Sequence, residues 1–312
     1  MSNDAPLYAR TLRNVGTEHA NAIVVDAGLA TSMQSDLFQV AFPERYVNLG
    51  IAEANAVGFA SGLARRGFRP IVHSFSNFLA RRAHDQIAIS IALPKLPVLL
   101  VGGSCGVFDG RNGPSHFASD DLATFTSLPG FKVYEPADGE DLKNAMREAM
   151  TEDGPSYLRL RRHGMRTGRA DEAKGGNGTH LVHAATEDAR VTIVVIGNLL
   201  EEAFTAVRIL ADQDVHADLF HVVRIKPLAA EKILASARRT QRPIVIENHC
   251  AVGGGAQAVT VALASYGLNV SCFTLPDRFL PAGDPRWLLA QVGLDANSLA
   301  DRIVALLHQG AA

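Results

Sequence analysis

Cysteine is scarce in this sequence of 312 residues, and its three copies, Cys105, Cys250 and Cys272, lie far apart. No C-x-x-C pair occurs, so neither a disulfide framework nor a zinc knuckle is expected. Residues 1–14 are polar and lack the apolar core of a secretory signal. These absences predict a protein of a reducing compartment, which we expect to be the cytoplasm.

Long hydrophobic runs and an excess of one charge are missing as well. The most apolar region, residues 87–101, is interrupted by Pro94, Lys95 and Pro97 and is too short to span a bilayer. With 30 basic and 32 acidic residues, the formal net charge of −2 gives no general attraction to nucleic acid or to an anionic membrane. We therefore expect neither of them as a partner.

Two nucleotide-binding patterns are also absent. The sequence contains neither Gly-x-Gly-x-x-Gly nor Gly-x-x-x-x-Gly-Lys-Ser/Thr, so a dinucleotide fold and a P-loop lose their main support. What remains is an ordinary globular composition, with 47% hydrophobic and 20% charged residues. The length is sufficient for two domains, each with its own core.

Short apolar runs alternate with helix-length segments along the chain. Near-continuous apolar strands separated by helices are typical of a parallel sheet covered on both faces. From residue 165 the composition changes to Gly, Lys, Arg, Asp and Thr without periodicity, which indicates a linker. We therefore predict an α/β protein of two doubly wound domains, residues 1–164 and a smaller one at 187–312, joined by a linker at 165–186.

The expected elements follow from the same pattern. In the first domain we predict strands at 22–26, 69–73, 97–101, 131–134 and 156–160, with helices at 78–93 and 138–150, the second of them capped by Asp138. In the second domain we predict strands at 191–197, 217–222 and 243–247, with helices at 201–212, 229–238, 255–266 and 298–307.

A carboxylate stands out within residues 45–58, where we predict a short strand, a turn at Gly50 and a helix whose first turn carries Glu53. Such an acid usually complements the positive end of the helix dipole. A functional role for Glu53 requires that other segments supply a site around it.

Ligands of open parallel sheets lie beyond the carboxyl ends of the strands, which directs attention to the loop at residues 102–116. Its glycines and the run Asn112-Gly113-Pro114-Ser115-His116 specify a rigid backbone, and long loops of this kind are usually functional. The run Gly253-Gly254-Gly255 can either cradle an anion on backbone N–H groups or allow tight packing of a strand on a helix.

Several segments, taken in order, resemble the transketolase family. They are FPERYVNLGIAE at 42–53, FSNFLARRAHDQ at 75–86, GPSH at 113–116, ENH at 247–249 before the triple glycine, and LPDRFLP at 275–281. The resemblance covers essentially the whole chain and implies a pyrimidine-binding domain followed by a transketolase C-terminal-like domain.

One family motif is missing. Transketolases bind the diphosphate of thiamine diphosphate through Gly-Asp-Gly and a later Asn, with a divalent metal between them, and no Gly-Asp-Gly occurs here. The resemblance therefore implies the C-terminal subunit of a split transketolase and no metal ligands in this chain. An N-terminal partner subunit would hold the diphosphate with Mg²⁺ or Ca²⁺, in an assembly that we expect to be α2β2.

The resemblance also implies roles for individual residues. Glu53 would hydrogen-bond the aminopyrimidine ring nitrogen of thiamine diphosphate, and His116 would contact the sugar near its reacting carbons. The other cofactor-binding candidates are Ile51, Phe75, Phe78 and Arg81. The other substrate-binding candidates are Asp26, Ser32, Arg111, Asn112, Arg159 and Arg162, with Arg81, Arg159 and Arg162 near the anionic end of a sugar phosphate.

Two positions depart from the family pattern. Asn112 stands where an acid is usual before Gly-Pro-Ser/Thr-His, and Phe117 follows the histidine where Gln is common. We expect both in the channel for the acceptor. We further expect Arg111 to add a cationic contact to an anionic terminus, either phosphate or sulfonate.

The resemblance implies an enzyme subunit that transfers a two-carbon ketol unit from a ketose phosphate to an aldose. One alternative is a decarboxylating relative, either similar to 1-deoxyxylulose-phosphate synthase or the β subunit of a 2-oxoacid dehydrogenase. Another alternative is a regulatory subunit that keeps the fold without catalysis.

Overall fold

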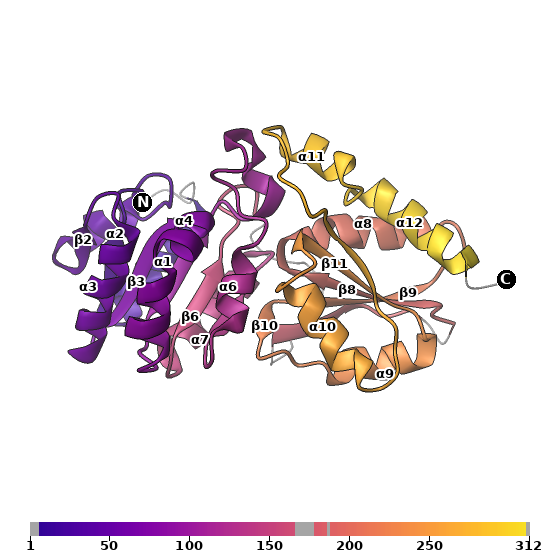
Figure 1. Cartoon of the computed structure of the whole chain (residues 1–312), viewed down its shortest axis with the longest axis horizontal. Coiled ribbons are helices and arrows are strands. Elements are labelled where there is room, and N and C mark those ends of the chain that lie inside the picture. Colours follow the sequence, from indigo (N-terminus) through magenta and orange to yellow (C-terminus); the bar gives the residue numbers. More distant parts are fainter. Residues whose placement is uncertain (1–5, 166–177, 186–187, 310–312) are drawn as a thin grey trace.

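The apolar runs of the sequence form two sheets, each with helices packed against its faces (Figure 1). The computed structural model describes residues 6–165, 178–185 and 188–309. The two sheets lie side by side along the longest axis of the molecule, the first built mainly from the N-terminal half and the second from the C-terminal half.

The first sheet has the strand order β10-β5-β6-β4-β3-β1-β2. Its neighbours pair in parallel, except that β10 runs antiparallel to β5. Because β2 and β3 lie on opposite sides of β1, the order reverses beside β1, and such switch points bind ligands at the carboxyl ends of strands. The strands are β1 (Ala22–Asp26), β2 (Tyr46–Asn48), β3 (Arg69–Phe75), β4 (Leu99–Gly103), β5 (Lys132–Tyr134), β6 (Ser156–Arg159) and β10 (Arg224–Lys226).

Alternate residues of the central strands face two different cores. Val24 packs in the cluster that includes residues of α1 (Leu7–Glu18) and α7 (Gly139–Thr151), whereas Val25 packs with residues of α3 (Glu53–Arg65). The remaining helices of this domain are α2 (Asp36–Ala41), α4 (Ser76–Arg82), α5 (His84–Gln86) and α6 (Asp121–Ser127), with 3₁₀ turns η1 (Pro43–Arg45) and η3 (Gly106–Asn112) and a π-helical turn η2 (Ile87–Ala92).

The second sheet has the order β12-β11-β8-β9-β7, parallel except for its edge strand β7. Its strands are β7 (Thr179–His183), β8 (Val191–Ile196), β9 (Ala217–Val222), β11 (Pro243–Cys250) and β12 (Ser271–Leu275). Its helices are η5 (Gly197–Leu199), α8 (Leu200–Ala211), α9 (Glu231–Thr240), α10 (Gly255–Ala264), α11 (Pro285–Gln291) and α12 (Ala296–Gln309).

The two domains share structure across their boundary. Strand β10 follows β9 in the chain but completes the first sheet, where Arg224 lies opposite Tyr134. Hydrophobic side chains of both domains, among them Phe125 and Phe220, belong to one buried cluster. The chain therefore does not divide into two independent modules.

Several predicted elements are confirmed and some are wrong in extent. Strands β1 and β9 have the predicted bounds, and Asp138 caps α7 by accepting hydrogen bonds from Glu140 N and Asp141 N at 3.0 and 2.9 Å. The predicted helix at 78–93 is interrupted at Ala83, whose φ and ψ of −119° and 11° break the helix between α4 and α5. The predicted linker is too long because β7 lies within it, while its residues 166–177 and 186–187 fall outside the described part.

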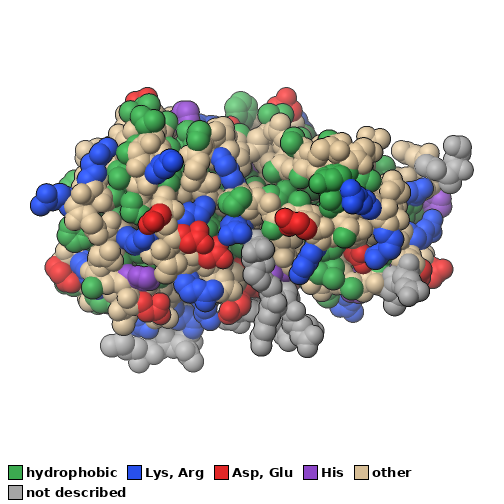
Figure 2. Space-filling model, turned by 90° about the horizontal axis from the view of Figure 1, so that it is seen from below, with side chains coloured by type: hydrophobic (Ala, Val, Ile, Leu, Met, Phe, Trp, Pro, Cys, Tyr) green, Lys and Arg blue, Asp and Glu red, His purple; other side chains and the backbone are tan. Residues whose placement is uncertain are grey.

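Charges of both signs are distributed over the face shown in Figure 2, where basic and acidic groups alternate across both domains. No helix in the described part of the chain is both long and apolar enough to cross a membrane.

Candidate cofactor and substrate site

Glu53 begins α3 directly after the turn that leaves β2. Gly50 adopts a φ of +69°, which glycine allows without strain, and its N–H donates to Asn48 Oδ1 at 2.9 Å. The Glu53 side chain is only 3% exposed and turns toward β3 and α4, where Oε1 accepts from Ser74 Oγ at 3.2 Å and from Arg82 Nη1 at 3.1 Å. This carboxylate therefore has a fixed orientation at the switch point of the first sheet.

Arg82 is a residue that the sequence reasoning missed. Its guanidinium joins Glu53 to the Phe78 ring, with Cζ 3.7 Å from the ring centroid, and its side chain is 48% exposed. A helical signal was available, since Phe78 and Arg82 are four residues apart and so share one face of α4. Arg81, for which the resemblance implies a cofactor contact, pairs with both carboxylate oxygens of Asp120 at 2.9 Å.

Three predicted residues come together as an aromatic group. Phe75 ends β3 and Phe78 lies in the first turn of α4, with ring centroids 5.5 Å apart. The His116 ring lies edge-on to both, at 6.1 Å from Phe75 and 5.5 Å from Phe78. Segments far apart in the sequence thus form one wall next to the Glu53–Arg82 pair.

The loop that carries His116 has a defined backbone. Gly113 adopts a φ of +75°, and its carbonyl accepts from His116 N at 3.0 Å. The His116 Nδ1 atom lies 2.9 Å from Ser115 Oγ, and Asn77 Nδ2 donates to the Phe117 carbonyl at 2.7 Å. The rigid turn predicted from Asn-Gly-Pro-Ser-His is therefore present.

Ile51 is 80% exposed in the turn before Glu53, which is an unusual position for a large apolar side chain. Asp26, in contrast, is fully buried and holds the turn after β1, where it accepts from Leu29 N at 2.6 Å and from Ser35 Oγ at 3.2 Å. Its carboxylate is engaged in this turn, and the expected substrate contact at Asp26 stays a prediction.

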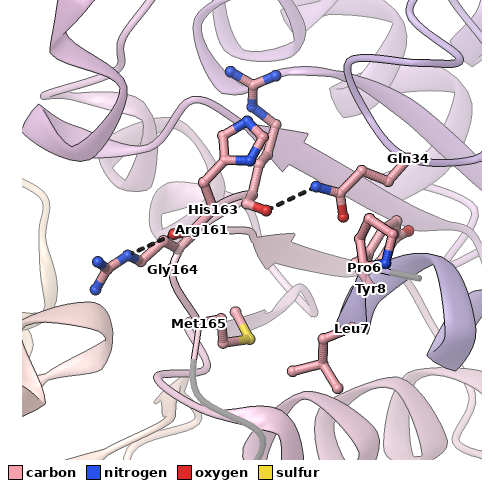
Figure 3. A pocket seen from close by; sticks show the side chains of 9 residues that line it. Pro6, Leu7, Tyr8, Gln34, Arg161, His163, Gly164 and Met165 are labelled. Carbon is pink, nitrogen blue, oxygen red and sulfur yellow. Dashed lines mark hydrogen bonds between the residues drawn. The ribbon is translucent and has the colours of Figure 1, made fainter. Parts of the chain in front are cut away.

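Arg162 connects the aromatic group to a neighbouring cavity. Its Cζ lies 4.8 Å from the Phe75 centroid, its Nη2 pairs with Asp109 at 2.9 Å, and its Nη1 donates to the Ser32 carbonyl at 2.8 Å. The cavity measures about 220 Å³ and is lined by Pro6, Leu7, Tyr8, Gln34, Arg161, Arg162, His163, Gly164 and Met165. Gln34 Nε2 donates to the Arg162 carbonyl at 2.8 Å, and Figure 3 shows Gln34 on one side of the cavity.

Arg159 does not face a substrate site. It is fully buried between the domains, where Nε pairs with Asp121 at 3.0 Å and Nη1 with Glu135 at 2.9 Å. Its Nη2 donates to the carbonyls of Ala118 and Asn248. Because every nitrogen of this guanidinium is engaged, the prediction of an anion-binding role is wrong in this structure.

The residues at and beside the family departures have different surroundings. Arg111 is 79% exposed and pairs with Asp284 of the second domain at 3.1 Å, while Asn112 is exposed beside it. Phe117 is 2% exposed and packs in the core of the second domain. It therefore does not line a channel for the acceptor, because its ring is enclosed by apolar side chains.

The triple glycine serves an internal anion. Glu247 accepts from Gly255 N at 2.6 Å and from Ala256 N at 2.9 Å, so its carboxylate occupies the start of α10. A Cβ on Gly254 would lie 2.4 Å from Glu247 Oε2, which explains why glycine is needed there. Both interpretations of this run therefore apply. Backbone N–H groups bind a carboxyl group, which belongs to the chain itself, and the glycine allows that group to pack closely against the start of the helix.

Two family models match this chain. The pyrimidine binding domain of transketolase matches residues 5–167, and the transketolase C-terminal domain matches residues 180–299. The chain belongs to the transketolase family. A putative transketolase C-terminal section from Methanocaldococcus jannaschii is 34% identical over 95% of this chain and 94% of its own length. The predicted resemblance and fold class are therefore confirmed.

Two further comparisons show how much of a related transketolase-family protein this chain spans. The 1-deoxy-D-xylulose-5-phosphate synthase 1 of Geobacter sulfurreducens is 34% identical over 96% of the chain, which spans only 47% of that enzyme. A solved structure described as a split gene transketolase, inactive beta4 tetramer, superposes with a TM-score of 0.85 at 31% identity and covers 97% of both chains. The chain thus spans about half the length of the synthase and nearly the whole length of the split gene transketolase chain.

Membership of this family implies dependence on thiamine diphosphate, and the residues here fit one end of that cofactor. A buried carboxylate with fixed orientation, an aromatic wall and the exposed Ile51 suit an aminopyrimidine ring. Within the ranges 6–165, 178–185 and 188–309, no group of three or more His, Cys, Asp or Glu residues is arranged to hold a metal ion. The residues that suit the ring all lie within the range 5–167 that the pyrimidine binding domain model matches.

Proposed function

We propose that this chain is the C-terminal subunit of a two-chain transketolase, which transfers a two-carbon ketol unit from an anionic ketose to an aldose. The observation that carries the proposal is the Glu53 carboxylate, which is buried at the switch point and held by Ser74 and Arg82. Thiamine diphosphate, when bound, supplies the electron sink for cleaving and forming the carbon–carbon bond.

The Glu53 carboxylate would share a proton with the aminopyrimidine ring nitrogen. Ser74 and Arg82 both donate to Oε1 and so fix the orientation of the carboxylate. Its other oxygen, Oε2, has only a long hydrogen bond of 3.4 Å from Arg82 Nη1. Positioned proton transfer of this kind contributes about 10²- to 10⁴-fold to a rate.

Phe75, Phe78 and Ile51 provide apolar surface that excludes water around the ring. His116 lies edge-on to both phenylalanines, and since Nδ1 is next to Ser115, its Nε2 is the nitrogen that contacts the sugar hydroxyls. The site therefore joins a cofactor surface to a substrate surface through one aromatic group.

We place the anionic end of the sugar beside the cavity lined by residues 161–165, where Arg162 would have to exchange its present bonds to Asp109 and to the Ser32 carbonyl for the anion. Arg81 and Asn112 are exposed and remain as outer contacts to a partner or to a substrate. A phosphate and a sulfonate both suit a guanidinium, so the terminal group is decided by assay.

The partner in this proposal is an N-terminal subunit that carries the diphosphate motif with Mg²⁺ or Ca²⁺. The cofactor lies between the subunits, in a cytoplasmic α2β2 assembly. The extent of this chain, close to that of the split gene transketolase chain, supports this division.

The test is reconstitution with the partner subunit, thiamine diphosphate and Mg²⁺, followed by assay with xylulose 5-phosphate and an aldose phosphate. Ketol transfer is the expected result. A parallel series with a sulfonated ketose identifies the preferred anion. Absence of transfer with every ketose, while the cofactor binds, would contradict the proposal.

The second candidate is a decarboxylating synthase, which the 34% identity to the Geobacter sulfurreducens enzyme favours. Pyruvate with glyceraldehyde 3-phosphate tests it in the same reconstituted complex. Release of CO₂ from pyruvate without ketol transfer from xylulose 5-phosphate selects this alternative. Failure of thiamine diphosphate to bind with the partner present selects a regulatory subunit.

A further inference from the structure

The segment that carries His116, residues 104–118, is closed at its base. Ala118 N donates to the Ser104 carbonyl at 2.9 Å, and Gly106 N donates to the Ala118 carbonyl at 2.6 Å. Between these contacts the chain passes through η3 and the turn at Gly113 before it reaches His116. The position of the imidazole therefore depends on what holds the base of this loop.

The base lies in the crevice of the second sheet. Strands β9 and β11 lie on opposite sides of β8, so the order reverses beside β8, where open sheets ordinarily bind ligands. Residues that follow or end these strands, Asn198 and Asn248, are buried and point at the loop of the first domain. The loop occupies the place of a ligand.

The hydrogen bonds in this crevice have a single direction. The Val107 N–H can only donate, so the atom of Asn248 that lies 3.0 Å from it is Oδ1. Asn248 Nδ2 then donates to Asn198 Oδ1 at 3.1 Å, which leaves Asn198 Nδ2 to face Cys105 Sγ at 3.3 Å. The two amides form a clamp that presents an acceptor to Val107 and a donor to Cys105.

The close contact requires glycine at position 106. Gly106 has a φ of +55°, and a Cβ there would lie 2.3 Å from Asn248 Cγ. The backbone thus lies directly on the Asn248 amide, and a displacement of that side chain is transmitted to the loop.

Apolar contacts extend the attachment on both sides of His116. Val107 and Phe117 both pack in the core of the second domain, and a Cβ on Gly110 would lie 2.1 Å from Leu288 Cδ1 of α11. Gly283 N donates to the Gly110 carbonyl at 3.1 Å, and Figure 1 shows the segment before α11 reaching across to the first domain.

We propose that Asn248 is a positioning residue for the reaction: through the Val107 N–H it fixes the loop that holds His116 against Phe75 and Phe78. The second domain thereby determines the geometry of the substrate surface in the first. This inference rests on the proposed function in one respect, the role of His116 in binding the ketose.

The test compares three variants of the full chain. Asn248→Leu keeps the size of the side chain and removes the acceptor, whereas Asn248→Asp keeps the acceptor for Val107 N–H. Thr192→Val is the matched control, because the Thr192 hydroxyl is buried in the same domain near Ser236 and Thr240, at the opposite end of β8. Amide hydrogen exchange over residues 105–117 is measured for each, together with the NMR signal of the His116 imidazole.

For Asn248→Leu we expect exchange in residues 105–117 to become about ten-fold faster than in Thr192→Val, the effect of losing one buried hydrogen bond. Asn248→Asp should restore the protection and the imidazole signal. In the reconstituted enzyme, Asn248→Leu should raise KM for the ketose about ten-fold, while half-saturation by thiamine diphosphate changes less than about two-fold, since Glu53 lies outside the loop.

Equal protection of residues 105–117 in Asn248→Leu and Thr192→Val would overturn the inference, as would an unchanged His116 signal. These readouts need no catalysis. If the loop loosens as expected but the wild-type complex transfers no ketol unit, the positioning role stands and the proposed function fails.

Discussion

The carboxyl ends of the strands are used differently in the two domains, although both domains have the same doubly wound architecture. In the first domain this edge presents Glu53, Ile51 and the Phe75–His116 group, with Ile51 almost fully exposed. In the second domain the corresponding edge is filled by the first domain, and Asn198, Asn248 and His249 are buried in contact with it. One fold thus supplies a site in one copy and a support in the other.

The difference lies in where the polar groups find partners. At the edge of the second sheet, His249 finds both of its partners within the chain: Nε2 accepts from Leu122 N at 3.1 Å, while Nδ1 lies 2.7 Å from the Cys250 carbonyl. In the first domain, the Glu53 carboxylate is oriented by Arg82, which is itself half-exposed. Loss of a side chain should therefore reduce activity at the edge of the first sheet and stability at the edge of the second sheet.

The largest effect is expected at the carboxyl edge of the first sheet, which carries Glu53, Ile51, Phe75 and His116 (the site edge). Glu53→Gln should lower ketol transfer by about 10²- to 10⁴-fold with no large change in melting temperature, because the shared proton is lost while the side chain keeps its size. Steady-state kinetics of the reconstituted complex measures it. Glu44→Gln, at an exposed glutamate before β2, is the control. Retention of more than about a tenth of the activity would contradict the assigned role.

Arg159 ends β6 of the first sheet, where the first domain packs against the support edge formed by Asn198, Asn248 and His249. Arg159→Met should lower the free energy of unfolding by about 3–5 kcal/mol, because the buried acids Asp121 and Glu135 would lose their cationic partner. Urea unfolding measures the loss. Lys143→Met, which removes an exposed pair with Glu140, should change the free energy of unfolding by less than about 1 kcal/mol. A similar loss in both variants would remove the proposed distinction between the two edges.

The support edge should also respond to acid through His249. Burial, together with the nearby Arg159 charge, lowers the pKa of His249 from its ordinary 6.5 to about 4. As pH falls, His249 takes up a proton in the unfolded chain near pH 6.5, before it does so in the folded chain near pH 4. The folded state is therefore fully stable with respect to this residue above pH 6.5 and loses stability as pH falls from 6.5 to 4. The integrated loss is about 3 kcal/mol at most.

The measurement is urea unfolding of wild type and His249→Gln at several pH values, since the difference between them isolates this residue. Burial also lowers the pKa of His73 to about 4, so His73 likewise reduces the stability of the fold as pH falls. Burial raises the pKa values of Glu135 and Glu247 to about 7, so these two acids reduce the stability of the fold as pH rises. Parallel curves for wild type and His249→Gln would contradict the prediction.

A smaller effect separates neighbours in α4. Arg82→Met should lower kcat about ten-fold, because a half-exposed charged hydrogen bond to Glu53 is removed. Arg81→Met, which breaks only an exposed pair with Asp120, should stay within about two-fold of wild type. A larger effect at Arg81 than at Arg82 would assign the cofactor contact to Arg81, as the resemblance implies.

The smallest effect concerns Arg111. Because its guanidinium is engaged by Asp284 at an exposed position, Arg111→Ala should change KM for the ketose less than about two-fold. A rise of ten-fold or more, seen in steady-state kinetics, would instead place Arg111 on the anionic end of the substrate.

Much of the fold could be predicted because its signals are local. Continuous apolar runs gave β1 and β9 their bounds, and Asp138 acts on the first turn of its own helix. Strand β10 could not be found in this way, because three residues form a strand only through pairing with β5, about ninety positions earlier in the chain.

Part of the candidate site could be predicted from the sequence, because its residues stand in motifs that resemble the family pattern. Glu53, Phe75, Phe78 and His116 are brought together as the family pattern implied. Arg159 was misassigned because a sequence does not show that Asp121 and Glu135 meet it in a buried cluster. Phe117 was misassigned for a related reason, since its ring packs in the core of another domain.

Strand β10 has a consequence for anyone who wishes to divide or recombine this protein. It forms the edge of the first sheet next to β5, although the chain enters it from the second domain. A fragment that ends after β6 would leave β5 as an open edge, and unprotected edges of this kind pair with other chains. Exchange of domains between relatives must therefore carry residues 224–226 with the first domain.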